Sequence, residues 1–501
     1  MKMIVEEKRE IPVVAEVDVV VVGGGPAGIM AALASARGGA STILIERFGG
    51  LGGMGATGMN LMIFALEEPR GITKEIWIDR MLASGYAVHH KDLCEEIARG
   101  RIFGNSIGHA KYWDFFLSYL IYDAERFRYE ADLMMEEAGV RVYYQNVFAG
   151  TIAAGGRIQA IVVENVSGRQ AVRTSMVVDA TGAGDVVARV GAPFIPAADT
   201  TGAPVPAGMM YKMSGVDIDR LIDYLATDPG LATLVARAQS AGALPYYRRK
   251  QTLEKMGHYD AVYTGKPRPE IGLTRYSKLG ELLCWGGPVQ HEWKLDPSTR
   301  AEDLSRAFVS IRKQIIAEVE FFTGYVPGFE KAYLTAVSPY VGAREKRHPI
   351  GEYMLTANDV ESGRRFDDMV VYKGPDPGAL RMGLHRNFDI PYRALLPKET
   401  ENLLVAGDCI SADHGAFLNI RSLYNAGHTG EVAGTAAALA VKGNTDLRTV
   451  EYSNLKARLI AQGVFPDRDA MDAWLEKQLA ILHSRDRELL YLDGYYKKKS
   501  S

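Results

Sequence analysis

The sequence of 501 residues predicts an α/β fold built around a parallel sheet, and three neighbouring segments carry this prediction. Residues 19–22 form a continuous run of valines, which is typical of a strand buried on both faces of a parallel sheet. Residues 26–37 are rich in alanine and predict a helix, and residues 42–45 form a second β-rich run. Together they predict one strand–helix–strand unit within about thirty residues.

Composition excludes several classes of protein. The net charge of −3 and the balanced charged fraction of 24% argue against a disordered chain and against a basic nucleic-acid binder. Cys94, Cys284 and Cys409 are far apart, so local spacing builds neither a disulfide framework nor a metal cluster, and we expect no metal site. Glycine is the one outlier: 52 of the 501 residues are glycine, about a tenth of the chain, whereas the usual share is about 7%. Their placement should therefore show where backbone approaches backbone or a ligand.

The turn after the first strand carries the pattern GxGxxG. Gly23 suits the tight turn, Gly25 lets the start of the helix approach a pyrophosphate, and Gly28 permits close packing of helix on strand. Glu46 ends the next strand, where a carboxylate can accept hydrogen bonds from a ribose. In this context the motif predicts a Rossmann-type dinucleotide-binding domain.

Further elements follow from apolar periodicity. We expect a long helix over residues 112–137, strands over 140–147, 152–166 and 175–179, a strand over 403–406, a small-residue helix over 425–441, and helical segments over 448–459 and 471–490. The prolines between residues 191 and 387 indicate a mixed region that covers the first domain. The predicted parts are residues 1–190, the first part of the nucleotide-binding domain with a helical insertion at about 60–139; 191–389, a mixed α+β substrate or cap domain; 390–443, the return of the first domain; and 444–501, a C-terminal helical segment.

Two later segments favour FAD over NAD as the bound dinucleotide, because they resemble signatures of flavoproteins. Residues 177–185, VVDATGAGD, look like the second flavoprotein signature, and residues 403–408, LLVAGD, resemble the third. With the glycine loop at 49–58 and the segments 341–353 and 390–396, they resemble the FAD-dependent oxidoreductase family of the glutathione-reductase-2 structural type. The resemblance spans most of the chain and implies FAD as cofactor, but no particular substrate.

The motifs and the resemblance together identify a set of residues. In the third signature the family's aspartate, here Asp408, holds a ribityl hydroxyl, and we expect the glycine loop to wrap the pyrophosphate. The predicted cofactor-binding residues are Gly23, Gly25, Pro26, Ala27, Gly28, Glu46, Arg47, Gly53, Met54, Val147, Ala180, Thr181, Gly182, Asp185, Gly407, Asp408 and Asn425. The glycines of the 425–441 helix have two compatible interpretations, approach to the flavin or helix packing.

Four residues are candidates for catalysis. His414 and Arg421 follow Asp408 on the segment that should pass the flavin, which favours His414 as acid or base. Arg344 and His348 belong to a cationic run that the resemblance places near the flavin. There an arginine could grip a carboxylate or carbonyl oxygen, and His348 could exchange a proton. An exposed basic turn with one buried ion pair is an equally good interpretation of this run.

We expect an enzyme that oxidises a C–H bond of a small polar substrate as a dehydrogenase or oxidase. Oxygen, a quinone or a carrier protein would then accept the electrons. The alternatives are reduction of an activated C=C bond, flavin monooxygenation, and a non-enzymatic electron-transfer subunit. A disulfide reductase is disfavoured because no CxxC motif is present, and no second strand–GxGxxG–helix unit for NAD(P)H is evident.

The sequence also allows a coarse prediction of the protein's location and partners. Residues 1–10 lack the apolar stretch of a secretory signal, and the most apolar segment, at 17–34, is interrupted by glycines and Asp18. We therefore expect a cytoplasmic protein with no membrane or nucleic-acid partner. A homo-oligomer is an open possibility, since the helical end could supply a dimer surface.

Overall fold

The computed structural model describes residues 4, 9–63, 70–89, 120–199, 207–221, 272–277, 280–286, 300–374, 386–473 and 475–476. Its largest sheet has seven strands in the order β6-β2-β1-β9-β8-β7, with β18 also paired to β9. The strands are β1 (Val13–Val22), β2 (Thr42–Ile45), β6 (Arg141–Tyr143), β7 (Val147–Ala154), β8 (Arg157–Asn165), β9 (Gly168–Asp179) and β18 (Leu403–Val405). The α/β class and the parallel arrangement predicted from the sequence are confirmed.

Strand β9 pairs with some neighbouring strands in parallel and with another in antiparallel fashion. It runs parallel to β1 on one edge, and its last residues pair in parallel with β18 on the other. Its first half pairs with β8 in antiparallel fashion, and β8 pairs with β7 in the same way, which forms the predicted meander. The chain therefore returns to this sheet more than two hundred residues after leaving it.

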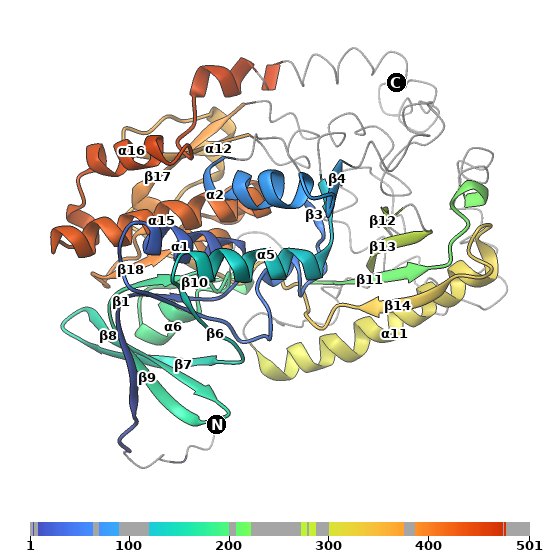
Figure 1. Ribbon diagram of the computed structural model, residues 1–501, viewed down its shortest axis with the longest axis horizontal. Coiled ribbons are helices and arrows are strands. Elements are labelled where there is room, and N and C mark those ends of the chain that lie inside the picture. Colours follow the sequence, from blue (N-terminus) through green and yellow to red (C-terminus); the bar gives the residue numbers. More distant parts are fainter. Residues whose placement is uncertain are drawn as a thin grey trace.

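Two helices from distant parts of the sequence cover this sheet side by side (Figure 1). They are α1 (Pro26–Arg37), as predicted, and α15 (Leu423–Gly443). A Cβ on Gly430 would lie 2.1 Å from the carbonyl oxygen of Ala27, and one on Gly434 would lie 2.1 Å from that of Ala31. Of the two interpretations of the α15 glycines, helix packing thus applies to both of these positions.

The insertion between β2 and β6 is not purely helical. It contains a three-stranded antiparallel sheet in the order β3-β5-β4, a one-turn helix α2 and a π-helix. Their bounds are Met62–Ile63 for β3, Ala87–His89 for β4, Leu120–Tyr122 for β5, Gly71–Lys74 for α2 and Glu75–Leu82 for the π-helix.

The long helix predicted over 112–137 is wrong in its first described part. Residues 120–122 form β5, and α5 spans Ala124–Glu137. Asp123 sets its start, because the carboxylate accepts a hydrogen bond from the amide of Arg126 at 2.7 Å. Residues 112–119 lie outside the described ranges.

A second hydrophobic cluster forms around an antiparallel sheet and one long helix, at the lower right of Figure 1. The sheet order is β12-β13-β11-β14, and helix α11 (Ala301–Tyr325) buries Ile311, Ile315 and Phe322 in this cluster. The strands are β11 (Met209–Ser214), β12 (Gly272–Ser277), β13 (Glu281–Gly286) and β14 (Tyr333–Val337). This mixture of helix and strand lies within the region predicted as the cap, whose boundaries stay a prediction.

Shorter elements complete the fold. Two-stranded sheets pair β10 (Phe194–Pro196) with β15 (Arg347–Pro349), and β16 (Met369–Lys373) with β17 (Phe388–Pro391). The helices are α6 (Asp185–Val190), α12 (Ala357–Ser362), α14 (His414–Ile420) and α16 (Tyr452–Ala461). Most of the helix predicted over 471–490 lies outside the described ranges.

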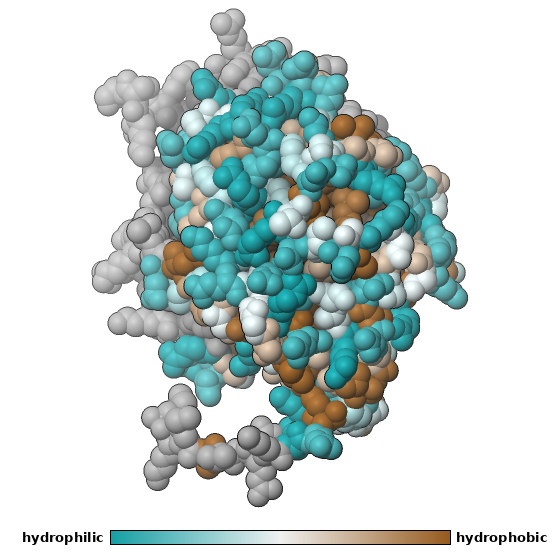
Figure 2. Space-filling model, turned by 90° about the vertical axis from the view of Figure 1, so that its left-hand side faces the viewer, coloured by the Kyte–Doolittle hydropathy of each residue, from teal (hydrophilic) through white to brown (hydrophobic). Residues whose placement is uncertain are grey.

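The surface carries both polar and apolar side chains. Figure 2 shows one face that is covered mostly by hydrophilic residues, with hydrophobic ones gathered mainly toward its lower end. Within the ranges described above, no helix has both the length and the apolar character needed to cross a bilayer.

Candidate functional site

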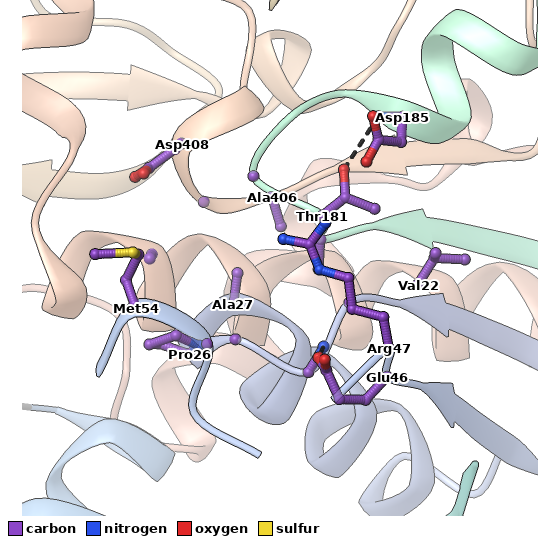
Figure 3. A pocket seen from close by; sticks show the side chains of 18 of the residues that line it. Val22, Pro26, Ala27, Glu46, Arg47, Met54, Thr181, Asp185, Ala406 and Asp408 are labelled. Carbon is purple, nitrogen blue, oxygen red and sulfur yellow. Dashed lines mark hydrogen bonds between the residues drawn. The ribbon is translucent and has the colours of Figure 1, made fainter. Parts of the chain in front are cut away.

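A cavity lies where the parallel strands β1, β2, β9 and β18 end and helix α1 begins (Figure 3). Of the predicted cofactor-binding residues, all except Gly28 and Asn425 line it. The carboxyl ends of parallel strands are the usual place for ligands in open α/β sheets, because the loops there can diverge to either side. The structure thus brings residues 22–27, 45–48, 180–185 and 406–408 to one site.

The GxGxxG turn brings helix α1 against the sheet. Gly23 has a φ of +103°, and a Cβ there would lie 2.5 Å from the carbonyl oxygen of Ala180. A Cβ on Gly28 would lie 1.7 Å from the carbonyl oxygen of Gly23, so this glycine serves packing, as predicted, and does not face the cavity. No side chain from the described ranges caps the start of α1, whose first residues Pro26 and Ala27 line the cavity. The helix start therefore offers its amides and its positive dipole end to an anion.

Glu46 is held in place by the backbone. Its two carboxylate oxygens accept hydrogen bonds from the amides of Gly24 at 2.6 Å and Phe48 at 2.7 Å. Burial raises the pKa of Glu46, and these backbone hydrogen bonds oppose the rise. A carboxylate has further lone pairs, so Glu46 can still accept hydroxyl hydrogen bonds from the cavity side.

Arg47 extends from the same turn across the cavity in Figure 3. Its guanidinium lies 5.0 Å from the ring centroids of both Phe48 and Tyr340, and all three residues line the cavity. The two rings restrain the cation, which leaves it available to an anionic or polar group.

In the second signature, several hydrogen bonds converge on Asp179 at the end of β9. The Thr181 hydroxyl donates to Asp179 at 2.7 Å, and Asp179 also accepts from the amides of Val186 and Val187 at the start of α6. Burial raises the pKa of Asp179 to about 6. Asp185 pairs with Arg347 of β15 at 2.8 Å, and this ion pair restrains its position on the cavity wall.

Asp408 lies on the opposite side of the α1 start from Glu46 (Figure 3). It belongs to a single 3-10 turn, Gly407–Cys409, in which Gly407 has a φ of +76°. Desolvation raises the pKa of Asp408 to about 6, while the charges of Lys346 and Arg421 lower it. The carboxylate forms no hydrogen bond within the described part of the chain, so it can accept one from a ligand.

Helix α15 begins at the cavity. Ser422 and Leu423 line the wall, and the Ser422 hydroxyl caps the helix by accepting from the amide of Asn425 at 3.1 Å. The Asn425 side chain is fully buried and donates to the carbonyl oxygen of Ile420 at 2.5 Å. Asn425 therefore positions the backbone before α15, and its contact with a cofactor stays a prediction.

The four predicted catalytic residues separate into two pairs. Arg344 and Arg421 line the cavity, whereas His348 and His414 do not. The two histidines instead meet at Glu345, whose Oε1 lies 2.7 Å from His414 Nδ1 and 3.0 Å from His348 Nε2. This contact raises the pKa of His414, and desolvation opposes the rise.

The histidine pair is nevertheless connected to the cavity. Glu345 sits in the chain between Arg344 and Lys346, both of which line the wall. Arg421 is close enough to lower the pKa of both His414 and Asp408 electrostatically.

Sequence reasoning missed Glu345 and Lys346. Lys346 lines the cavity and donates from Nζ to the carbonyl oxygen of Gly182 at 3.0 Å. Both residues belong to the cationic run 344–348, and only the suggestion of a buried ion pair in that run pointed toward them. Tyr340 and Asn60 also line the cavity, and no motif in the sequence marked either residue.

The arrangement fits a flavin dinucleotide. An uncapped helix start suits a pyrophosphate, and the carboxylates of Glu46 and Asp408 on its two sides suit the hydroxyls of a ribose and a ribityl chain. A Cβ on Gly25 would meet no atom of the described residues nearer than Gly53 Cα at 4.0 Å, so the missing side chain leaves room for such a ligand.

Comparisons with curated sequences and solved structures find only distant similarity. No curated protein sequence matches the chain. Similar solved structures include a geranylgeranyl bacteriochlorophyll reductase-like protein from Thermoplasma acidophilum, with 13% identity, a TM-score of 0.42 and coverage of 95% of this chain and 99% of that one. The p-nitrophenol 4-monooxygenase of Pseudomonas putida has 12% identity and a TM-score of 0.41, and the match covers 95% of this chain and 95% of that one. The L-amino acid deaminase of Proteus myxofaciens has 15% identity and a TM-score of 0.41, and the match covers 90% of this chain and 95% of that one. Similarity this distant assigns no activity.

The sequence profile of one family covers most of the chain. The profile described as "FAD dependent oxidoreductase" matches residues 18–459, from the first buried strand to helix α16. This range includes every residue named above on the cavity wall. The cofactor is FAD, and the chain belongs to the FAD-dependent oxidoreductase family.

Proposed function

We propose that this oxidoreductase is a dehydrogenase or oxidase that removes hydride and a proton from a small polar substrate with a C–H bond next to O–H or N–H. FAD, when bound, supplies the acceptor for the hydride at N5. The observation that carries the proposal is the pair of Glu345 and His414, together with Arg344 and Arg421 on the cavity wall. This pairing provides a base and an oxygen-binding cation in the same region.

His414 is suited to the proton transfer. Its Nδ1 is engaged by Glu345, and its side chain is 21% exposed, so Nε2 remains accessible. A histidine oriented by a carboxylate is a typical general base, because the carboxylate stabilises the imidazolium that forms.

The arginines are suited to the substrate's oxygen. A guanidinium binds carboxylate and carbonyl oxygens with two parallel hydrogen bonds, which fixes orientation as well as charge. Arg421 is favoured because it lines the cavity and its charge lowers the pKa of both His414 and Asp408.

Reduction of an activated C=C bond is the second candidate, because the same histidine could donate a proton in that direction. Monooxygenation requires rapid reduction by NADH or NADPH, and an electron-transfer subunit requires a partner protein. The observation that favours oxidation is the carboxylate on His414, which stabilises a proton taken up from substrate.

Anaerobic mixing of the FAD-loaded protein with a substrate panel tests the proposal. The panel contains 2-hydroxy acids, amino acids, amines and polyols, with NADH and NADPH as separate arms, and bleaching is followed at about 450 nm. We expect bleaching by one organic class, slowed about 100-fold or more by His414→Asn. Bleaching only by NAD(P)H, or oxidation of chemically reduced protein only by an enone, would contradict it.

A further inference from the structure

One buried carboxylate serves two histidines from different parts of the chain. Glu345 Oε1 contacts His348 Nε2, three residues further on, and His414 Nδ1 on helix α14. The side chain of Glu345 is 0% exposed and that of His348 is 3% exposed, whereas that of His414 is 21% exposed. The three groups thus form a series that runs from the interior toward solvent.

The shared oxygen determines which nitrogen of His414 carries its proton. An ionised carboxylate only accepts hydrogen bonds, so Nδ1 of His414 donates to it. Within the described residues Nε2 of His414 has no hydrogen-bond partner. The nitrogen left to exchange a proton is therefore Nε2.

His348 restrains the carboxylate from the other side. It lies on β15, where it pairs with Ile195 of β10, and its ring meets Phe417 of α14 edge-on at 5.6 Å. These contacts leave its Nε2 little freedom to move away from Glu345. A carboxylate with two nitrogen partners cannot rotate to satisfy one without loss of the other.

The backbone of His414 is equally restrained. Asp413, the N-cap of α14, accepts from the amide of Ala416 at 2.8 Å and from the amide of Ala357 at 3.0 Å. The charged groups that act on His414 are Glu345, Asp413 and Arg421. Among the described residues, only Glu345 forms a hydrogen bond to the ring.

From this geometry we propose that Glu345 is a positioning residue that holds His414 with Nε2 free for proton exchange, and that His348 holds Glu345. This inference rests on the proposed function for the role of His414. It assigns to His348 a structural contact with the carboxylate in place of a proton exchange with substrate.

The chain offers matched variants. Glu345→Gln keeps the shape of the side chain but loses the charge. His348→Gln retains an N–H donor toward Glu345, whereas His348→Leu does not. Glu401→Gln, an exposed partner of Arg157, is the control for loss of a carboxylate elsewhere.

The first measurement does not depend on any substrate. FAD-loaded protein with ¹⁵N-labelled histidine reports the tautomer and the pKa of His414 by NMR, with His414→Asn to assign the signal. We expect Glu345→Gln and His348→Leu to lower the His414 pKa and to mix its tautomers, and His348→Gln and Glu401→Gln to leave both unchanged. An unchanged His414 signal in Glu345→Gln and His348→Leu would overturn the proposal.

The second measurement is anaerobic flavin bleaching by the substrate class found above. We expect a rate about 100-fold lower in Glu345→Gln with unchanged FAD content, and a near-normal rate in His348→Gln. If Glu345→Gln does not fold, the contrast between His348→Leu and His348→Gln decides the question. If His414→Asn bleaches at the normal rate while the NMR shifts occur, the proposed function fails and the positioning contact stands.

Discussion

His414 Nδ1 lies 2.7 Å from Oε1 of Glu345, a carboxylate with no exposure to solvent. The two residues are 69 positions apart in the chain, and the contact joins helix α14 to the segment that carries Arg344 and Lys346 along the cavity wall. Because the carboxylate stabilises the imidazolium, the pKa of His414 lies above its ordinary value of 6.5.

A pH profile of substrate oxidation follows from this shift. Only the neutral form of His414 can take a proton, so kcat/KM should rise with pH and reach half its maximum above pH 6.5. Initial rates between pH 5.5 and 9 at fixed ionic strength measure it. A flat profile over that range would remove His414 from the rate-determining proton transfer.

Asp408→Asn should act in opposite directions on cofactor binding and on stability. FAD affinity should fall about 10- to 100-fold, because a charge-assisted hydrogen bond is lost. In flavin-free protein, burial raises the pKa of Asp408 from 3.8 to about 6, so the folded state holds this proton more tightly than the unfolded state does. The stability that this proton contributes is present below pH 3.8 and is lost as pH rises through about 6.

The variant should therefore be more stable than the wild type at pH 7.5, by up to about 3 kcal/mol, and nearly equal to it at low pH. Urea unfolding of flavin-free protein at pH 4.5 and 7.5, with FAD titrations at pH 7.5, checks both effects. Asp79→Asn, a surface partner of Lys74, is the control. An Asp408→Asn protein that binds FAD normally would contradict the predicted contact.

Gly430→Ala should destabilise the protein by about 1 to 3 kcal/mol or more, because its Cβ would lie 2.1 Å from the carbonyl oxygen of Ala27 in helix α1. Gly324→Ala in helix α11 is the matched control, since no atom of the residues that the structure describes lies within 4 Å of its Cβ position. There we expect unchanged stability or a gain of up to about 1 kcal/mol. Thermal unfolding of both variants measures the difference, and equal midpoints would argue against the tight contact of α1 with α15.

Tyr122→Phe should loosen the glycine loop that lines the cavity. The Tyr122 hydroxyl donates to the carbonyl oxygen of Gly55 at 2.5 Å, and its loss should cost about 1 kcal/mol, or roughly a fivefold weaker affinity for FAD. Flavin fluorescence titration measures the affinity, and Tyr129→Phe on the exposed face of α5 is the control. Equal affinities in the two variants would show that the loop does not depend on this hydrogen bond.

Local motifs explain which part of the site could be predicted from the sequence. Gly23, Glu46, Thr181 and Asp408 lie at strand ends, where neighbouring residues already determine the backbone path. Their assembly at one cavity requires only the general rule that parallel strands end on the same edge. This is why the fold class and most of the cavity wall were predictable.

Long-range contacts explain what could not be predicted. Glu345 lies in a run of cations that is equally compatible with an exposed turn, and only the tertiary contact with His414 shows its burial. The start of α5 was also misplaced, because apolar spacing continues through residues 120–122 although they pair as a strand. Apolar periodicity does not reveal the change from strand β5 to helix α5. The signal in the sequence that marks the start of the helix is its capping residue, Asp123.

The pairing of β18 with β9 has a consequence for synthesis of the protein. Leu403 pairs beside Val177, and the turn that bears Asp408 follows directly. A ribosome that adds about 5 to 20 residues per second needs about 11 to 45 seconds to pass from the end of β9 to the start of β18. During that interval the nascent chain holds the end of β9 with one edge unpaired, an edge that could pair with another chain. Strand β18 thus both protects that edge and brings the carboxylate of Asp408 to the cavity.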